Sequence, residues 1–157
     1  MTAQVTFLRT LAVAVAVAAV TSALAGCAHL VVLRDPLTAG EHNDLGVAYE
    51  SGGQPDLAAR EYRKALGLDP RDARARVNLG NIEAANGRWG EAERCYRRAL
   101  RDSVTDTDAM NNLAVALLRQ GRGLDEARAL AARAVAVGGA RDSVYRATLA
   151  EVDSAGR

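Results

Sequence analysis

The chain has 157 residues, of which 49% are hydrophobic and 4% aromatic, and its 20 Lys and Arg balance 19 Asp and Glu. This length fits one domain of ordinary size, and the near-neutral charge excludes a basic nucleic-acid footprint and an acidic disordered tail. The two cysteines and two histidines are too scattered for a structural zinc site, so neither a metal nor another cofactor is expected. A core made mainly of Ala, Leu and Val favours closely packed helices over a sheet.

The first 26 residues have the pattern of an export signal. Arg9 precedes an uncharged run, Leu11–Ala25, which is shorter than the about 20 residues of a membrane-spanning helix. The junction Leu24-Ala25-Gly26-Cys27 resembles the lipobox of bacterial lipoproteins. In that family the signal is cut before the cysteine, whose sulfur then carries lipid. We therefore expect residues 1–26 to be a signal peptide and Cys27 to be lipidated; an uncleaved signal anchor is the alternative.

Residues 27–40 are expected to form a membrane-proximal tether, which spans at most about 45 Å when fully extended. Three roles are open for its apolar segment Leu30–Leu33: contact with the bilayer surface, docking on the first helix, or binding of a partner. The lipid would hold the protein in the cell envelope, facing the periplasm. Ala28 stands where inner-membrane lipoproteins of enteric relatives carry Asp, which favours the outer membrane but leaves the inner one open.

The remaining sequence repeats with a period of 34 residues. The period relates Leu45, Leu79 and Leu113, and likewise Gly53, Gly87 and Gly121. The first unit has the pattern His42-x2-Leu45-Gly46-x2-Tyr49, then Ala58-x3-Tyr62, then Pro70. This pattern resembles the tetratricopeptide repeat, a helix-turn-helix unit of the same period.

The resemblance implies an all-α fold, a tetratricopeptide α-α superhelix of three helix pairs plus a C-terminal capping helix. The repeat domain is expected over 41–157, with repeats at about 39–72, 73–106 and 107–141 and the capping helix at 142–155. Gly46, Gly80 and Ala114 are small where paired helices must approach closely. The recurring glycines end the first helices in a left-handed cap. The Trp of the family pattern is replaced by His42, Arg76 and Met110.

Stacked helix pairs of this family offer a concave groove, lined by the first helix of each unit, that binds an extended peptide or a partner helix. The resemblance implies that Asn78 and Asn112 bond the ligand backbone, because an amide is both donor and acceptor. The same groove is expected to contain Asn43, Arg74, Asn81, Asn111 and Arg119. Alternatively, the asparagines satisfy contacts between helices. A carboxylate clamp is not predicted, because its places hold Asn43, Val47, Asp108 and Asn112.

No set of nucleophile, base and orienting residue is visible, and no phosphate-binding loop, so the chain is not expected to be an enzyme. Cys95 is either a small buried hydrophobe or available for pairing with another chain. The predicted function is a non-catalytic, lipid-anchored interaction scaffold of the bacterial envelope that assists assembly of a pilus or secretion complex. The alternative is an adaptor for cell-wall hydrolases or outer-membrane biogenesis. Expected partners are a protein or extended peptide and the membrane, through Cys27, but no nucleic acid.

Overall fold

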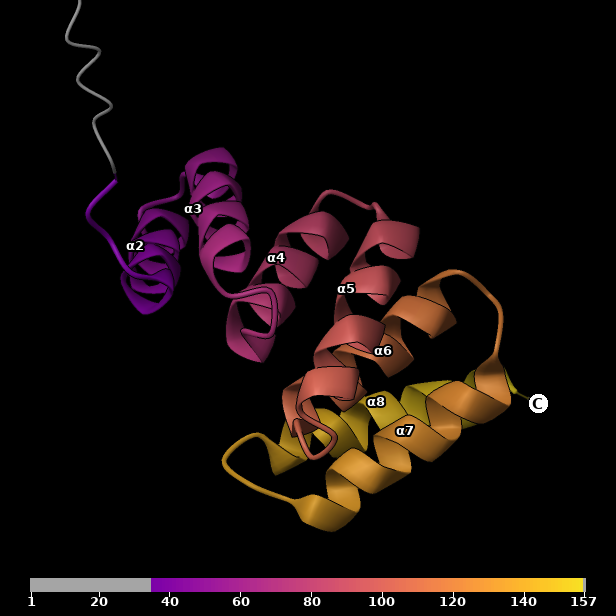
Figure 1. Cartoon of the computed structure of the whole chain (residues 1–157). Coiled ribbons are helices and arrows are strands. Elements are labelled where there is room, and N and C mark those ends of the chain that lie inside the picture. The colour runs from indigo at the N-terminus through magenta and orange to yellow at the C-terminus, as the bar shows by residue number, and fades with distance from the viewer. Residues whose placement is uncertain (1–34, 157) are drawn as a thin grey trace, which may run out of the picture. The chain divides into compact units, whose positions relative to one another are not determined.

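The computed structural model describes residues 35–156, so the expectations for the signal peptide, for Cys27 and for residues 28–34 lie outside the described part. Seven helices and no strand occur within residues 35–156 (Figure 1). They are α2 (Ala39–Ser51), α3 (Pro55–Leu68), α4 (Ala73–Ala85), α5 (Trp89–Asp102), α6 (Thr107–Arg119), α7 (Leu124–Val137) and α8 (Asp142–Ala155). The all-α prediction of three helix pairs followed by a further helix is thus confirmed. No helix of this part is both long and apolar enough to cross a membrane.

Local sequence signals start and stop the first helix of each pair. A polar side chain accepts a hydrogen bond from the backbone N–H three residues on, in turn at Thr38, Asp72 and Asp106. The glycines that follow these helices adopt left-handed φ values of 70°, 72° and 63° at Gly53, Gly87 and Gly121. Such caps satisfy backbone groups that a helix leaves unpaired at its ends. The predicted left-handed glycine caps are confirmed.

Within the first two pairs, a glycine of the first helix lies against a tyrosine ring of the second. A Cβ added to Gly46 would lie 2.4 Å from Cε1 of Tyr62, and one added to Gly80 would lie 2.6 Å from Cε1 of Tyr96. Both tyrosines are almost fully buried. The third pair has the small, fully buried Ala114 at the same place in the repeat. Small residues therefore set the close approach of paired helices, as the sequence predicts.

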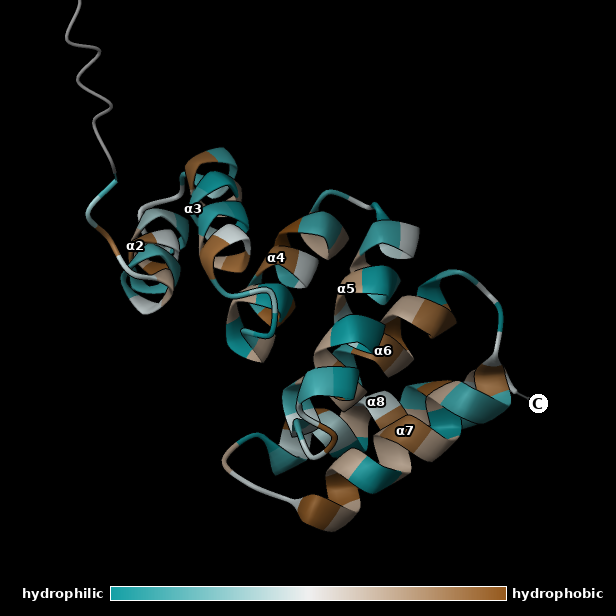
Figure 2. Cartoon of the chain, viewed as in Figure 1, coloured by the Kyte–Doolittle hydropathy of each residue, from teal (hydrophilic) through white to brown (hydrophobic). Residues whose placement is uncertain are grey.

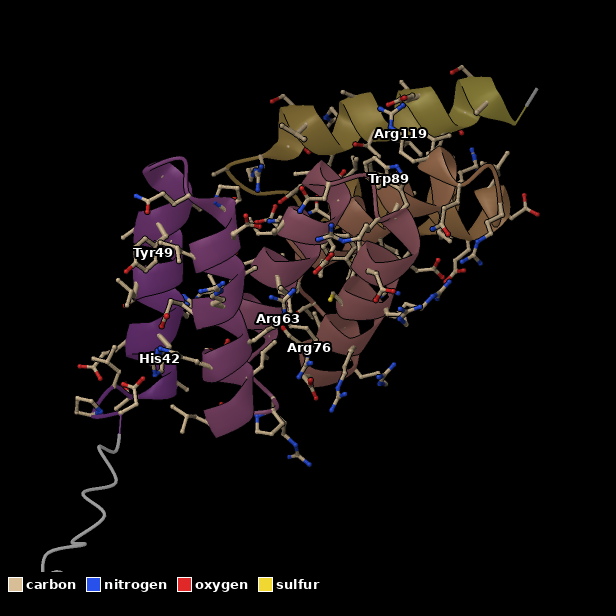
Figure 3. All side chains as sticks on the ribbon, turned by 90° about the horizontal axis from the view of Figure 1, so that it is seen from above. His42, Tyr49, Arg63, Arg76, Trp89 and Arg119 are labelled. Atoms are coloured by element: carbon tan, nitrogen blue, oxygen red, sulfur yellow. The ribbon has the colours of Figure 1, made fainter. Side chains whose placement is uncertain are left out.

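Polar side chains fill two places where the family pattern has tryptophan. His42 is 1% exposed, and its Nδ1 lies 2.7 Å from Oε2 of Glu61 on the partner helix α3. Figure 3 shows His42 on α2 beside α3. Arg76 is also buried and donates to the backbone carbonyl of Pro70 in the preceding turn. Hydrogen bonds thus replace part of the apolar packing that a tryptophan would provide.

The contacts between pairs give the stack its curvature. Successive first helices contact one another: α2 contacts α4, α4 contacts α6, and α6 contacts α8. Among the described helices, no comparable contact joins α3 with α5 or α5 with α7. The helices α2, α4 and α6 therefore lie on the inner, concave side, and α3, α5 and α7 lie on the outer side. The more apolar helices are α6 and α7, whereas α3 and α5 are largely hydrophilic (Figure 2).

Candidate binding groove

Asparagine amides link the three inner helices. Nδ2 of Asn78 on α4 donates to Oδ1 of Asn43 on α2 over 3.0 Å. Nδ2 of Asn112 on α6 donates to Oδ1 of Asn81 on α4 over 2.9 Å. Four of the five asparagines named from the sequence thus form two bridges between neighbouring helices. We call these four residues and Asn111 the asparagine row. The asparagines therefore do make contacts between helices, which the sequence analysis gave as the alternative to ligand binding.

Besides the buried Oδ1 of Asn111, the row leaves two polar groups without a hydrogen bond, both on half-buried side chains. Oδ1 of Asn81 already accepts from Asn112 and from the Tyr96 hydroxyl, at 2.9 Å each. Within residues 35–156, no hydrogen bond engages Nδ2 of Asn81 or Oδ1 of Asn78. Both residues are half-buried on the inner helix α4. The inner face consequently retains one donor and one acceptor, which match the C=O and N–H of a peptide group.

Two members of the row are buried and support it from behind. Asn43 is 1% exposed; it accepts from Asn78 and donates to Asp44 over 3.3 Å. Asn111 is 4% exposed, and its Nδ2 lies 3.3 Å from Oδ1 of Asn112. These two side chains are therefore buried, and each is hydrogen-bonded to a neighbouring polar side chain.

Each arginine near the groove is paired with a carboxylate on another helix. Arg74 of α4 lies 3.2 Å from Asp44 of α2, and Arg119 of α6 lies 3.2 Å from Glu151 of α8. Figure 3 shows Arg119 on the side of the repeats where α8 lies. Arg119 is thus tied to α8 by its ion pair. Both Arg74 and Arg119 are therefore already paired with a carboxylate.

A cavity of about 300 Å³ opens beside Asn81 and Asn112. We call it the α4–α6 pocket. Its lining consists of Asn81, Ala84, Ala85, Trp89, Tyr96, Asn112, Val115 and Arg141. The sequence pointed to the two asparagines but missed the other six residues. Val115 could have been found from the sequence, because the 34-residue period places it at the position of Asn81 in the next unit. Trp89 and Arg141 could not, because they adjoin turns outside the inner helices and only the fold brings them to the pocket.

The buried carboxylates outside the groove, within residues 35–156, are paired with basic side chains. Burial favours the neutral forms of Glu61 and Glu93, yet hydrogen bonds from His42 and Arg97 outweigh it and hold the pKa of both carboxyls below its usual value. A general base at neutral pH needs the opposite shift. Burial raises the pKa of the half-buried Cys95 thiol, which makes it a weaker nucleophile. Within residues 35–156, no three or more His, Cys, Asp or Glu side chains lie close enough together to hold a metal ion.

Comparisons with known proteins agree with the repeat fold. The family model of the tetratricopeptide repeat matches residues 43–103 and 81–144. Type IV pilus assembly protein PilF of Pseudomonas aeruginosa is 41% identical over 69 residues, which are 44% of this chain and 26% of that protein. The matched part of the chain thus corresponds to about a quarter of that relative's length.

A solved structure has the same fold. It is described as the first TPR of Spaghetti (RPAP3) bound to HSP90 peptide SRMEEVD. It superposes with a TM-score of 0.69 at 19% identity and covers 79% of this chain and 97% of that one.

Proposed function

We propose, from the premise that this chain belongs to the tetratricopeptide repeat family, that it is a non-catalytic interaction scaffold. A protein segment would lie in extended form along the inner helices α2, α4 and α6. The observation that carries this proposal is the asparagine row, which leaves a free donor on Asn81 and a free acceptor on Asn78. A structural neighbour that holds a peptide supports the same use of the fold.

We further propose that the partner belongs to a pilus or secretion complex of the bacterial envelope. The support is the similarity to a type IV pilus assembly protein, which extends over 69 residues, or about two repeats. The proposal is limited to the repeats, because the match covers only 26% of that protein.

The location belongs to the same proposal. Lipid on Cys27 would hold the chain at the periplasmic side of a membrane, preferably the outer one. Cys27 lies eight residues before Asp35, the first described residue. A tether of this length keeps the groove within tens of ångströms of the bilayer. Incorporation of labelled palmitate into the wild-type protein but not into Cys27→Ser tests the anchor.

Affinity capture of the tagged full-length protein from envelope extracts tests the partner. The variant Asn78→Ala/Asn112→Ala removes two amides of the row, whereas Asn86→Ala changes an exposed asparagine at the end of α4 outside the row. Asn78→Ala removes the free acceptor, and Asn112→Ala removes the bridge that positions the free donor of Asn81. Each hydrogen bond to a ligand is worth about 0.5–1.5 kcal/mol, so the double variant should recover at least about fivefold less of the pilus or secretion components.

The control variant should recover them like the wild type. Unchanged recovery by a double variant with an intact helical circular dichroism spectrum would reject the groove as the binding surface. Recovery that depends on the asparagines but contains no pilus or secretion component would reject the assignment to that assembly and keep the groove.

A further inference from the structure

We infer that the α4–α6 pocket receives one uncharged, apolar side chain from a neutral, extended segment of the protein partner. This inference rests on the proposed function, because it defines which segment the groove binds. It follows from the pocket's size, from the chemistry of its walls and from the charge balance around it.

The size and walls of the pocket fit a single side chain. A volume of about 300 Å³ lies at the lower end of the about 300–1,000 Å³ of pockets that hold small molecules. The methyl groups of Ala84, Ala85 and Val115 and the rings of Trp89 and Tyr96 form most of the lining. Removal of an aliphatic or aromatic side chain from water into this pocket would favour binding by about ten- to a hundredfold.

Among the asparagine groups at the wall of the pocket, the one that makes no hydrogen bond within residues 35–156 is a donor. Oδ1 of Asn81 is already bound by Tyr96 and Asn112, whereas its Nδ2 has no partner among the described residues. A backbone carbonyl next to the inserted side chain would accept from this Nδ2. The pocket therefore combines an apolar site with one directed hydrogen bond, which is how an extended chain is held in register.

The charges around the pocket cancel. Nη1 of Arg141 donates to Oδ1 of Asp108 over 3.1 Å, and the Tyr145 hydroxyl lies 2.9 Å from the same oxygen. A carboxylate brought to Arg141 would also meet Asp108 and would have to compete for a guanidinium that is already paired. The next arginine of the groove, Arg119, is likewise paired. Charge complementarity thus favours a neutral segment over an acidic one.

The pocket contains its own reporter. Trp89 is the single tryptophan of the chain and is partly buried in the pocket wall. Insertion of an apolar side chain displaces water from the ring and should shift its fluorescence emission to shorter wavelength.

A random nonapeptide library displayed on phage, panned on the tagged full-length protein in detergent, tests the inference. Selected peptides are then synthesised and titrated against Trp89 emission. We expect sequences with one large apolar residue flanked by uncharged residues, and a blue shift on binding. Ala85→Leu places an isobutyl group at the pocket from an exposed position of α4 and should weaken binding at least tenfold. The same substitution at the exposed Ala132 of α7, Ala132→Leu, should leave binding unchanged.

The remaining outcomes separate this inference from the proposed function. Enrichment of acidic peptides, or equal affinity of Ala85→Leu and wild type, would overturn the pocket inference. The groove would survive that result if Asn78→Ala/Asn112→Ala weakened the same peptides. If no peptide is enriched, the inference is overturned, and envelope capture that depends on the asparagines would then still uphold the proposed function.

Discussion

Gly80 provides the sharpest test at the scale of single residues. A Cβ at this position would lie 2.6 Å from Cε1 of Tyr96 and 3.1 Å from Cβ of Cys95. The tyrosine is 2% exposed and hydrogen-bonded to Asn81, so it has little room to move. Overpacking of a core costs about 1–3 kcal/mol. Gly80→Ala should lower the free energy of unfolding by that amount in urea denaturation.

The chain offers a matched control within a helix. A Cβ on Gly67 of α3 would meet no atom within 4 Å. Gly67→Ala should therefore leave stability unchanged or raise it by about 0.5–1 kcal/mol, because alanine loses less backbone entropy on folding. Equal effects of the two substitutions would contradict the role assigned to the glycine–tyrosine contact.

Some contacts of single residues could be predicted from the sequence, and others could not. The 34-residue period correctly identified Gly46 and Gly80 as points of close approach, because every tetratricopeptide pair must bring its helices together at that place. The period did not reveal that His42 is buried against Glu61, because this contact depends on the replacement of the pattern's Trp by His in the first unit. Periodicity thus predicts what all units share and misses what one unit changes.

Between elements, Glu93 of α5 joins two repeat units. Its carboxylate accepts from Arg97 over 2.8 Å, from Gln120 over 3.0 Å and from Arg122, in the turn that precedes α7. Burial favours its neutral form, yet these hydrogen bonds and charges outweigh burial and hold the pKa of Glu93 below its usual value. A carboxyl whose pKa is lower in the folded state stabilises the fold above its unfolded pKa, and the stabilisation is lost as pH falls through the folded value.

Stability should consequently decrease as the pH falls below about 4.3, the usual value for glutamate. Glu93→Gln should flatten this decrease, because the variant has no carboxylate to protonate there. Glu91→Gln, which makes the same change of charge at an exposed position of the same helix, should keep the wild-type slope. Melting temperatures between pH 3 and 7 check this. Parallel curves for Glu93→Gln and wild type would refute the role of this carboxylate.

The final helix α8 is held by both its neighbours. It contacts α6 and α7, and it contributes the buried Tyr145 and Val152 to the large apolar cluster. Val152→Asp would place an unpaired carboxylate in a site that is 2% exposed, at a cost of several kcal/mol, and should release α8. Ala150→Asp alters an exposed position of the same helix and should have little effect. Hydrogen exchange of the α8 amides distinguishes the two; equal protection would contradict the packing described.

The helices themselves could be predicted from the sequence, but their cross-links could not. The glycine caps and the spacing of leucines located the helix pairs, because both signals act within one unit. The bridge from Glu93 to Arg122 joins residues 29 positions apart, and one of them lies in the lengthened turn of the third unit. No local pattern places two such side chains together.

At the scale of the whole repeat stack, the buried apolar residues of 35–156 divide into two clusters of unequal size. The smaller one consists of Ala58, Ala59, Tyr62 and Ile82, whereas the larger one extends from α4 to α8. Because repeat proteins are stabilised mainly by contacts between neighbouring units, the pair α2–α3 should open first. Native-state hydrogen exchange should show weaker protection in α2 and α3 than in α5 and α6. Uniform protection throughout the helices would show that the stack opens only as a whole.

The groove was predictable only as far as the family pattern extends. The sequence singled out asparagines on the inner helices, and the fold brings Asn78, Asn81 and Asn112 to that face. The α4–α6 pocket could not be anticipated, because Arg141 enters it from the turn before α8, 60 positions along the chain from Asn81. Such a site depends on the curvature of the whole stack.

Photo-crosslinking in living cells tests the central claim, that the inner face binds the protein partner, most directly. A benzophenone amino acid is placed at Val47 on the inner helix α2 or, as the matched control, at Ala132 on the outer helix α7; both positions are exposed, and neither lines the α4–α6 pocket. We expect a crosslinked envelope-assembly protein from position 47 and none from position 132. Crosslinks from position 132 alone, or equally from both positions, would contradict the proposal that the concave groove is the binding surface.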